Sequence, residues 1–287
     1  MQKKITINDF IESKKNHKKI TMLTAYDYPM AKLIDEAGAD AILVGDSLGM
    51  VVLGYEDTTK VTMEDMLHHA KAVSRGAKRS MIIGDMPFLS YHLGRYESVK
   101  NAGRLVSEGG CTAVKLEGGC AVIDDIKAII NAGIPVMGHL GYTPQSINLF
   151  GGHKAQGKTI ETARNIVEDA MLLQDAGVFS LVLECVPFRL AGFISKRLDI
   201  PVIGIGSGSD CDGQVLVIND VLGLGSFTPK HAKVYNNIGE ASLQAVKNYI
   251  EEVVSETFPT QKNSFIIEDE VYQKLESEYR GMANESN

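Results

Sequence analysis

Runs of β-forming apolar residues alternate along the chain with stretches of helical character. The runs fall near residues 20–24, 41–45, 81–84, 112–116, 134–138, 179–183, 201–205 and 215–218. Strands that alternate with helical patterns are typical of parallel pairing through βαβ units. Eight such units in 287 residues favour a closed α/β (β/α)8 TIM barrel over an open doubly wound sheet, although the eighth run is weakly marked.

Glycines precede four of these runs. Gly38, Gly109, Gly133 and Gly177 each follow a stretch of helical character. A glycine can adopt the left-handed conformation that closes a helix, so each is expected to end one before the chain turns into a strand.

One domain accounts for the whole chain, since no linker rich in proline, glycine or serine divides residues 1–287. We expect a short N-terminal lead-in, about 1–20, before the barrel. An acidic tail, about 259–287, has the amphipathic pattern of a helix. Packing of this tail on the barrel or on a neighbouring subunit is favoured over a catalytic role.

Composition excludes several classes of protein. Hydrophobic residues make up 44% and charged residues 23%, as in ordinary globular enzymes. The net charge of −7 argues against a nucleic-acid partner. No apolar stretch approaches the length of about 20 residues needed to cross a membrane, and no signal peptide is evident, so a cytoplasmic location is expected. The four cysteines form no C-x-x-C pair and are expected to be buried free thiols.

Ionisable residues stand at the ends of five apolar runs. They are Asp46, Asp85, Lys115 with Glu117, His139 and Glu184. Because the carboxyl ends of parallel barrel strands meet at one mouth, these side chains are expected to form an active site.

Asp46 and Asp85 each follow an apolar run that ends in glycine. Two carboxylates on neighbouring strands, completed by water and substrate oxygens, are a usual way to hold Mg²⁺. The alternative is that each aspartate caps the loop that follows it. Because both occur in the same context, the metal site is favoured.

Lys115 and Glu117 are two positions apart, so their side chains point to the same face of the strand. They could form a buried ion pair, or an electrophile beside a metal ligand. His139 is flanked by glycines and is interpreted as a polar site residue. Glu184 ends an apolar strand, where burial suits a general acid or base, and its alternative role is an ion pair with Arg189.

Long motifs in this chain resemble the ketopantoate hydroxymethyltransferase family over roughly residues 4–257. They are LTAYD (23–27), VGDSLGM (44–50), GDMPF (84–88), VKLEGG (114–119), GHLG (138–141), LECVP (183–187) and DGQVLV (212–217). The resemblance implies a barrel of the phosphoenolpyruvate/pyruvate-domain type. It also implies Mg²⁺-dependent transfer of a hydroxymethyl group from 5,10-methylenetetrahydrofolate to 3-methyl-2-oxobutanoate, the first step of pantothenate biosynthesis.

The resemblance further implies residue roles and an assembly. Asp46 and Asp85 would bind the metal and the substrate around it, with Glu117 a third metal ligand acting through water. Ser47, Lys115 and His139 would contact the substrate, and Glu184 would be the catalytic acid and base. The family typically forms homodecamers.

Two alternatives remain for the function. One is another Mg²⁺-dependent lyase or mutase acting on 2-oxo acids in the same barrel superfamily, although the K-K-C-G-H type of loop is missing from the sequence. The other is an inactive barrel that serves as a scaffold, although Asp46, Asp85 and Glu117 are all present.

Overall fold

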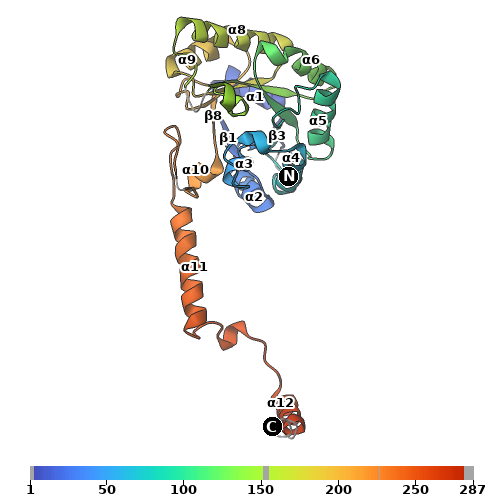
Figure 1. Ribbon diagram of the computed structural model, residues 1–287, viewed down its shortest axis with the longest axis vertical. Coiled ribbons are helices and arrows are strands. Elements are labelled where there is room, and N and C mark those ends of the chain that lie inside the picture. The colour runs from blue at the N-terminus through green and yellow to red at the C-terminus, as the bar shows by residue number, and fades with distance from the viewer. Residues whose placement is uncertain (1–2, 151–154, 226, 281–287) are drawn as a thin grey trace. The chain divides into compact units, whose positions relative to one another are not determined.

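The computed structural model describes residues 3–150, 155–225 and 227–280. Its eight parallel strands close into a barrel in sequence order, with β1 paired to β8, so the predicted fold is confirmed (Figure 1). The strands are β1 (Ile20–Thr24), β2 (Ala41–Val44), β3 (Met81–Asp85), β4 (Ala113–Glu117), β5 (Val136–Gly141), β6 (Ser180–Glu184), β7 (Val202–Ile205) and β8 (Gly213–Leu216).

The strands lie close to their predicted positions; β5 departs most, since it covers Val136–Gly141 against a predicted 134–138, and β8 is displaced as well. Strand β8 begins at Gly213, two residues before the predicted run, and Ile218 already belongs to a helix. Gly213 pairs with Ile20 of β1 and Ile203 of β7. A glycine at a strand start resembles a turn in the sequence, which explains the displaced prediction.

Helices follow the strands from β1 to β6 and cover the outside of the barrel, whereas β7 and β8 are joined by a short segment without a helix (Figure 1). The barrel unit contains α1 (Ile7–Lys15), α2 (Tyr28–Ala37), α3 (Leu48–Val51), α4 (Met63–Gly76), α5 (Arg95–Ser107), α6 (Ile123–Asn131), α7 (Ile147–Phe150), α8 (Ile160–Ala176), α9 (Phe188–Arg197) and α10 (Ile218–Leu222). Short 3₁₀ turns lie at η1 (Thr58–Lys60), η2 (Cys120–Val122) and η3 (Pro144–Ser146).

Three of the four predicted helix-closing glycines have the expected conformation. Gly38, Gly133 and Gly177 have φ angles of 89°, 84° and 96°. The prediction for Gly109 is wrong, because Gly110 takes the positive φ, 76°. Helix α5 ends with Glu108 as its cap, so the chain turns one residue later; a Cβ on Gly109 would lie 2.5 Å from the carbonyl oxygen of Leu105.

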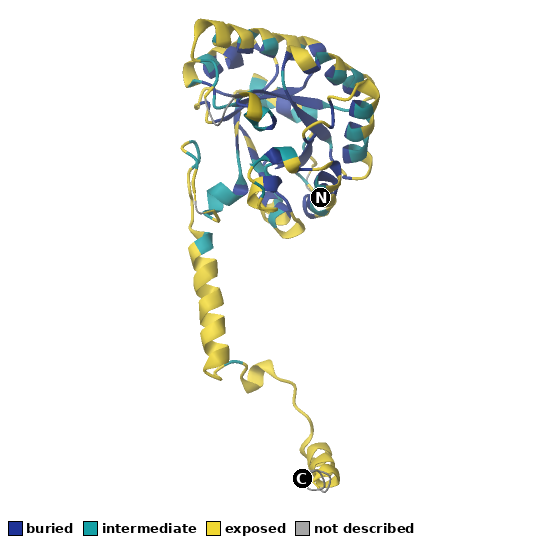
Figure 2. Ribbon diagram, in the orientation of Figure 1, coloured by how far each residue is buried: buried dark blue, intermediate teal, exposed yellow. Residues whose placement is uncertain are grey.

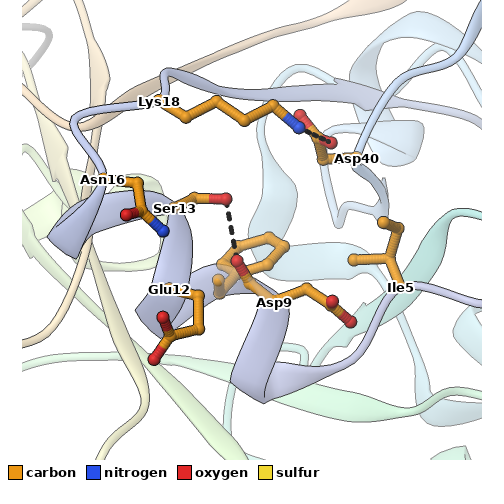
Figure 3. A pocket seen from close by; sticks show the side chains of 8 residues that line it. Ile5, Asp9, Glu12, Ser13, Asn16, Lys18 and Asp40 are labelled. Atoms are coloured by element: carbon orange, nitrogen blue, oxygen red, sulfur yellow. Dashed lines mark hydrogen bonds and ion pairs between the residues drawn. The ribbon is translucent and has the colours of Figure 1, made fainter.

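Helix α1 covers the amino end of the barrel. Its Phe10 is buried among the inward-facing residues and packs edge-on against Phe179, just before β6, with ring centroids 5.8 Å apart. A pocket of about 210 Å³ lies beside α1 (Figure 3), where Lys18 reaches Asp40 at 3.8 Å. Asp40 precedes β2, so this pocket is at the end opposite the predicted active site.

Residues Asn237–Asn287 form a second compact unit, separate from the barrel unit Met1–Asn236. It contains α11 (Ile238–Val254), η4 (Gln261–Asn263) and α12 (Asp269–Tyr279), which lies in the predicted acidic tail. Neither helix has a buried residue (Figure 2). The single-domain organisation stays a prediction.

All four cysteines are free, and Cys111 and Cys211 are buried as expected. The expectation of burial is wrong for Cys120, which is exposed, and Cys185 is half-buried. Cys120 stands in η2, at the surface loop after β4. In the described part of the chain, no helix is long and apolar enough to cross a membrane.

Candidate active site

The inside of the barrel changes from apolar to charged along its axis. Inward-facing positions near the amino end carry Met81, Ile83 and Ala113, which belong to the apolar interior. The next inward positions on the same strands, two residues further along each, are Asp85 and Lys115. Side chains continue to alternate between the inside and the outside of the barrel past the apolar interior. The predicted site residues therefore point into the barrel at its carboxyl end.

Strand register places opposite charges side by side. Asp85 of β3 is the register partner of Lys115 of β4, and Glu117 of β4 is the partner of His139 of β5. Glu184 ends β6, opposite Gly141. The barrel thus brings together Asp46, Asp85, Lys115, Glu117, His139 and Glu184.

The two aspartates are linked directly. Oδ2 of Asp85 accepts a hydrogen bond from the backbone N–H of Asp46 at 3.1 Å, and its Oδ1 lies 2.8 Å from Nζ of Lys115. Oδ2 of Asp46 accepts from the side chain of Gln145 at 2.8 Å. Among the described residues, neither carboxylate caps the loop that follows it, so the loop-capping alternative is wrong.

His139 lies between two carboxylates. Its Nδ1 is 3.4 Å from Oε1 of Glu117, and its Nε2 is 3.3 Å from Oε2 of Glu184, although the second contact lacks the alignment of a hydrogen bond. Lys115 pairs with Asp85 rather than with Glu117. Among the described residues Glu184 forms no ion pair with Arg189, whose guanidinium lies 6.0 Å from the ring centroid of Phe188.

Crowding of these charges shifts several pKa values. Burial, followed by the charges of Asp85 and Glu117, raises the pKa of Asp46 well above its usual range. Burial also raises the pKa of Asp85, although Lys115 opposes the change. Burial and Lys115 lower the pKa of His139, but the contacts with Glu117 and Glu184 outweigh them and raise it to about 9.

A divalent cation suits this excess of buried negative charge. Asp46, Asp85 and Glu117 are each at most 5% exposed, and the buried cations beside them are Lys115 and, with its raised pKa, His139. Within the described residues, no group of three or more histidine, cysteine, aspartate or glutamate side chains is arranged as a preformed ligand set. Mg²⁺ needs only one or two protein carboxylates when water and substrate oxygens complete its shell, which Asp46 and Asp85 could supply.

Some contributors to the site are not singled out by the sequence pattern. Ser47 is predicted to contact the substrate, and its Oγ lies 2.9 Å from the hydroxyl of Tyr26, which the pattern does not mark. Tyr91, in the loop after β3, and Gln145, in η3, contact Glu117 and are missed as well. No periodicity marks such residues, because they lie outside the strands and the long helices.

Comparison with known proteins identifies close relatives of the whole chain. A family profile described as ketopantoate hydroxymethyltransferase matches residues 4–261. The 3-methyl-2-oxobutanoate hydroxymethyltransferase of Acetivibrio thermocellus is 69% identical over 277 residues, covering 96% of this chain and 98% of that protein. The protein of the same name from Clostridium novyi is 57% identical over 273 residues, covering 95% and 99%.

Solved structures with the same fold are more distant in sequence. A phosphonopyruvate hydrolase in complex with oxalate and Mg²⁺ superposes with a TM-score of 0.56 at 12% identity, covering 99% of each chain. A 2,3-dimethylmalate lyase of the PEP mutase/isocitrate lyase superfamily gives a TM-score of 0.57 at 15% identity, covering 96% of each chain. These likenesses support the barrel fold and do not extend to the reaction.

Gly141 sets the position of the β6 end, and this can be tested with a matched pair of substitutions. Gly141 and Gly133 both have positive φ, 94° and 84°, but a Cβ on Gly141 would overlap the carbonyl oxygen of Glu184, whereas nothing lies within 4 Å at Gly133. We expect Gly133→Ala to lower the free energy of unfolding by about 1–2 kcal/mol, the cost of the left-handed backbone. We expect Gly141→Ala to cost a further 1–3 kcal/mol, roughly, from the overlap. Urea denaturation measures both, and equal losses would contradict this role for Gly141.

Proposed function

The chain belongs to the ketopantoate hydroxymethyltransferase family, and on that premise we propose that it transfers a hydroxymethyl group from 5,10-methylenetetrahydrofolate to 3-methyl-2-oxobutanoate. The observation that carries the proposal is the 69% identity, over 96% of the chain, to a protein with that hydroxymethyltransferase name. The product would be 2-dehydropantoate. Such substrates are small metabolites, which together with free thiols suits a cytoplasmic location.

The reaction begins with loss of a proton from C3 of the 2-oxo acid. The electron pair left behind spreads onto the keto oxygen, so the site must stabilise negative charge there. Mg²⁺ held by Asp46 and Asp85, with Glu117 nearby, would supply that stabilisation as a Lewis acid. Lys115, buried beside Asp85 at 2.8 Å, adds a fixed positive charge at the same end of the barrel.

Glu184 is the side chain we assign to proton transfer. Its side chain is 16% exposed, whereas that of His139 is 3% exposed, so it has the better access to solvent protons. His139 lies 3.3 Å from Glu184 and stands between this carboxylate and Glu117. After C3 attacks the methylene carbon of the folate, water completes the hydroxymethyl group and tetrahydrofolate leaves.

We propose a homo-oligomer, with the decamer of the family as the expected form, and helix α11 supports it. Its apolar residues recur along one face, and none is buried: Leu243, Val246, Tyr249, Ile250 and Val253. A helix with an uncovered apolar face has little stability alone in water. We propose that second copies of the chain cover this face.

The activity is tested with the purified protein, Mg²⁺ and both substrates. We expect 2-dehydropantoate to form, to stop when a chelator is added and to resume when Mg²⁺ is restored. Glu184→Gln should lower kcat by about 100-fold or more, the usual contribution of a general acid or base, with little change in KM for the 2-oxo acid.

The matched control is Glu168→Gln, an exposed position on α8, which should leave kcat unchanged. Lack of product with saturating substrates would refute the proposal and favour an inactive barrel. Conversion of the 2-oxo acid without folate would favour the lyase or mutase alternative.

The assembly is tested by sedimentation of the full chain. We expect about ten subunits for the wild type, by the family resemblance, and fewer for Ile250→Asp, which places a charge in the apolar face of α11. Asn248→Asp adds the same charge on the opposite face and should keep the assembly. A monomeric wild type, or equal effects of the two substitutions, would refute a role for this face.

A further inference from the structure

Gln145 is a buried amide that joins two of the proposed metal ligands. It lies in η3, after β5, and is 5% exposed. Its Nε2 donates to Oδ2 of Asp46 at 2.8 Å, and its backbone N–H donates to Oε2 of Glu117 at 3.0 Å. One residue therefore holds a carboxylate from the end of β2 and another from the end of β4.

The orientation of the Gln145 amide is fixed by its surroundings. Nε2 also donates to the carbonyl oxygen of Met86 at 2.9 Å, and Oε1 accepts from the hydroxyl of Tyr91 at 2.8 Å. A carbonyl can only accept a hydrogen bond. A flipped amide would place Oε1 against that carbonyl and Asp46, so the flipped arrangement is excluded.

Tyr91 determines the direction of the hydrogen bonds. Its hydroxyl accepts the backbone N–H of Glu117 at 3.3 Å, and its single proton goes to the shorter contact, Oε1 of Gln145. Tyr91 is 1% exposed, so water does not compete for this proton. The result is a directional chain from the backbone of β4 through Tyr91 and Gln145 to Asp46, in which neighbouring bonds reinforce one another.

We propose that Gln145, oriented by Tyr91, is a positioning residue that selects which carboxylate oxygens face the divalent cation. The inference rests on the proposed function, because that function places the cation at Asp46. Gln145 engages Oδ2 of Asp46 and Oε2 of Glu117. Oδ1 of Asp46 receives no hydrogen bond from the described residues, and Oε1 of Glu117 faces His139 at 3.4 Å.

Metal affinity should therefore depend on residues that do not touch the metal. Partners that hold a ligating group in place commonly contribute 10- to 100-fold, roughly, to metal affinity. Loss of the Gln145 amide frees the Asp46 carboxylate to rotate, whereas loss of the Tyr91 hydroxyl only loosens the Gln145 amide. The effect of Gln145 should be the larger of the two.

The test measures the Kd for Mn²⁺ alone by electron paramagnetic resonance, with the full chain and no substrate. We expect Gln145→Met to raise this Kd by about 10- to 100-fold. Tyr91→Phe should raise it less, by about threefold to tenfold on the same basis. The Kd of the double variant should rise by less than the product of the two single increases, because both substitutions act through one amide.

Gln174→Met is the matched control. Oε1 of Gln174 accepts the backbone N–H of Asp199 at 2.6 Å, outside the active site, so this variant loses an amide hydrogen bond but should keep the wild-type Kd. If Gln145→Met does not fold, Tyr91→Phe tests the same chain, since it removes only one oxygen.

Three results would overturn the inference. They are a Kd within twofold of wild type for every folded site variant, an equal effect of Gln174→Met, and a wild type that does not bind Mn²⁺. If the wild type binds Mn²⁺ and the variants weaken it, but no 2-dehydropantoate forms, the positioning role stands and the proposed function fails.

Discussion

Burial of like charges at one end of the barrel is the constraint on which the rest of the structure depends. Asp46, Asp85 and Glu117 are withdrawn from water together, and Lys115 makes its close ion pair with only one of them, Asp85. Removing a charge from water costs several kcal/mol, roughly, unless a partner compensates. A site with this imbalance is poor for stability and well suited to bind a cation, which is a common compromise at functional sites.

The barrel can hold these charges because the rest of its interior is apolar and firmly paired. Continuous strand register fixes Asp85 beside Lys115 and Glu117 beside His139, so the side chains cannot move apart without breaking the sheet. At the opposite end, Phe10 of α1 closes the interior. Residues outside the strands complete the hydrogen bonding of the site: the Tyr91 hydroxyl donates to the side chain of Gln145, which donates in turn to Asp46.

Much of this arrangement can be predicted from sequence, because the pattern of apolar residues determines where strands lie and which side chains point inward. Contacts between strands and loops cannot be predicted in this way. The apolar run that ends at Asp85 marks the end of β3, whereas β5 continues two residues past His139 to Gly141. The two-residue spacing of Lys115 and Glu117 correctly places both inside the barrel. The partners of these residues depend on neighbouring strands and loops, so the Lys115–Asp85 pair and the role of Gln145 have no local signature. The prediction that Gly109 closes a helix is wrong because the left-handed turn lies one residue later, at Gly110.

The most direct test of this charge imbalance is the free energy of unfolding of wild type and Asp46→Asn, each measured with a chelator and with Mg²⁺. Asparagine can still accept from Gln145 but carries no charge. We expect the variant to be more stable than wild type in chelator. Wild type should gain about 2.7 kcal/mol at Mg²⁺ concentrations 100-fold above Kd, and the variant almost nothing. A variant that is less stable in chelator and gains as much from Mg²⁺ as wild type would contradict the claim that uncompensated charge at Asp46 creates the cation site.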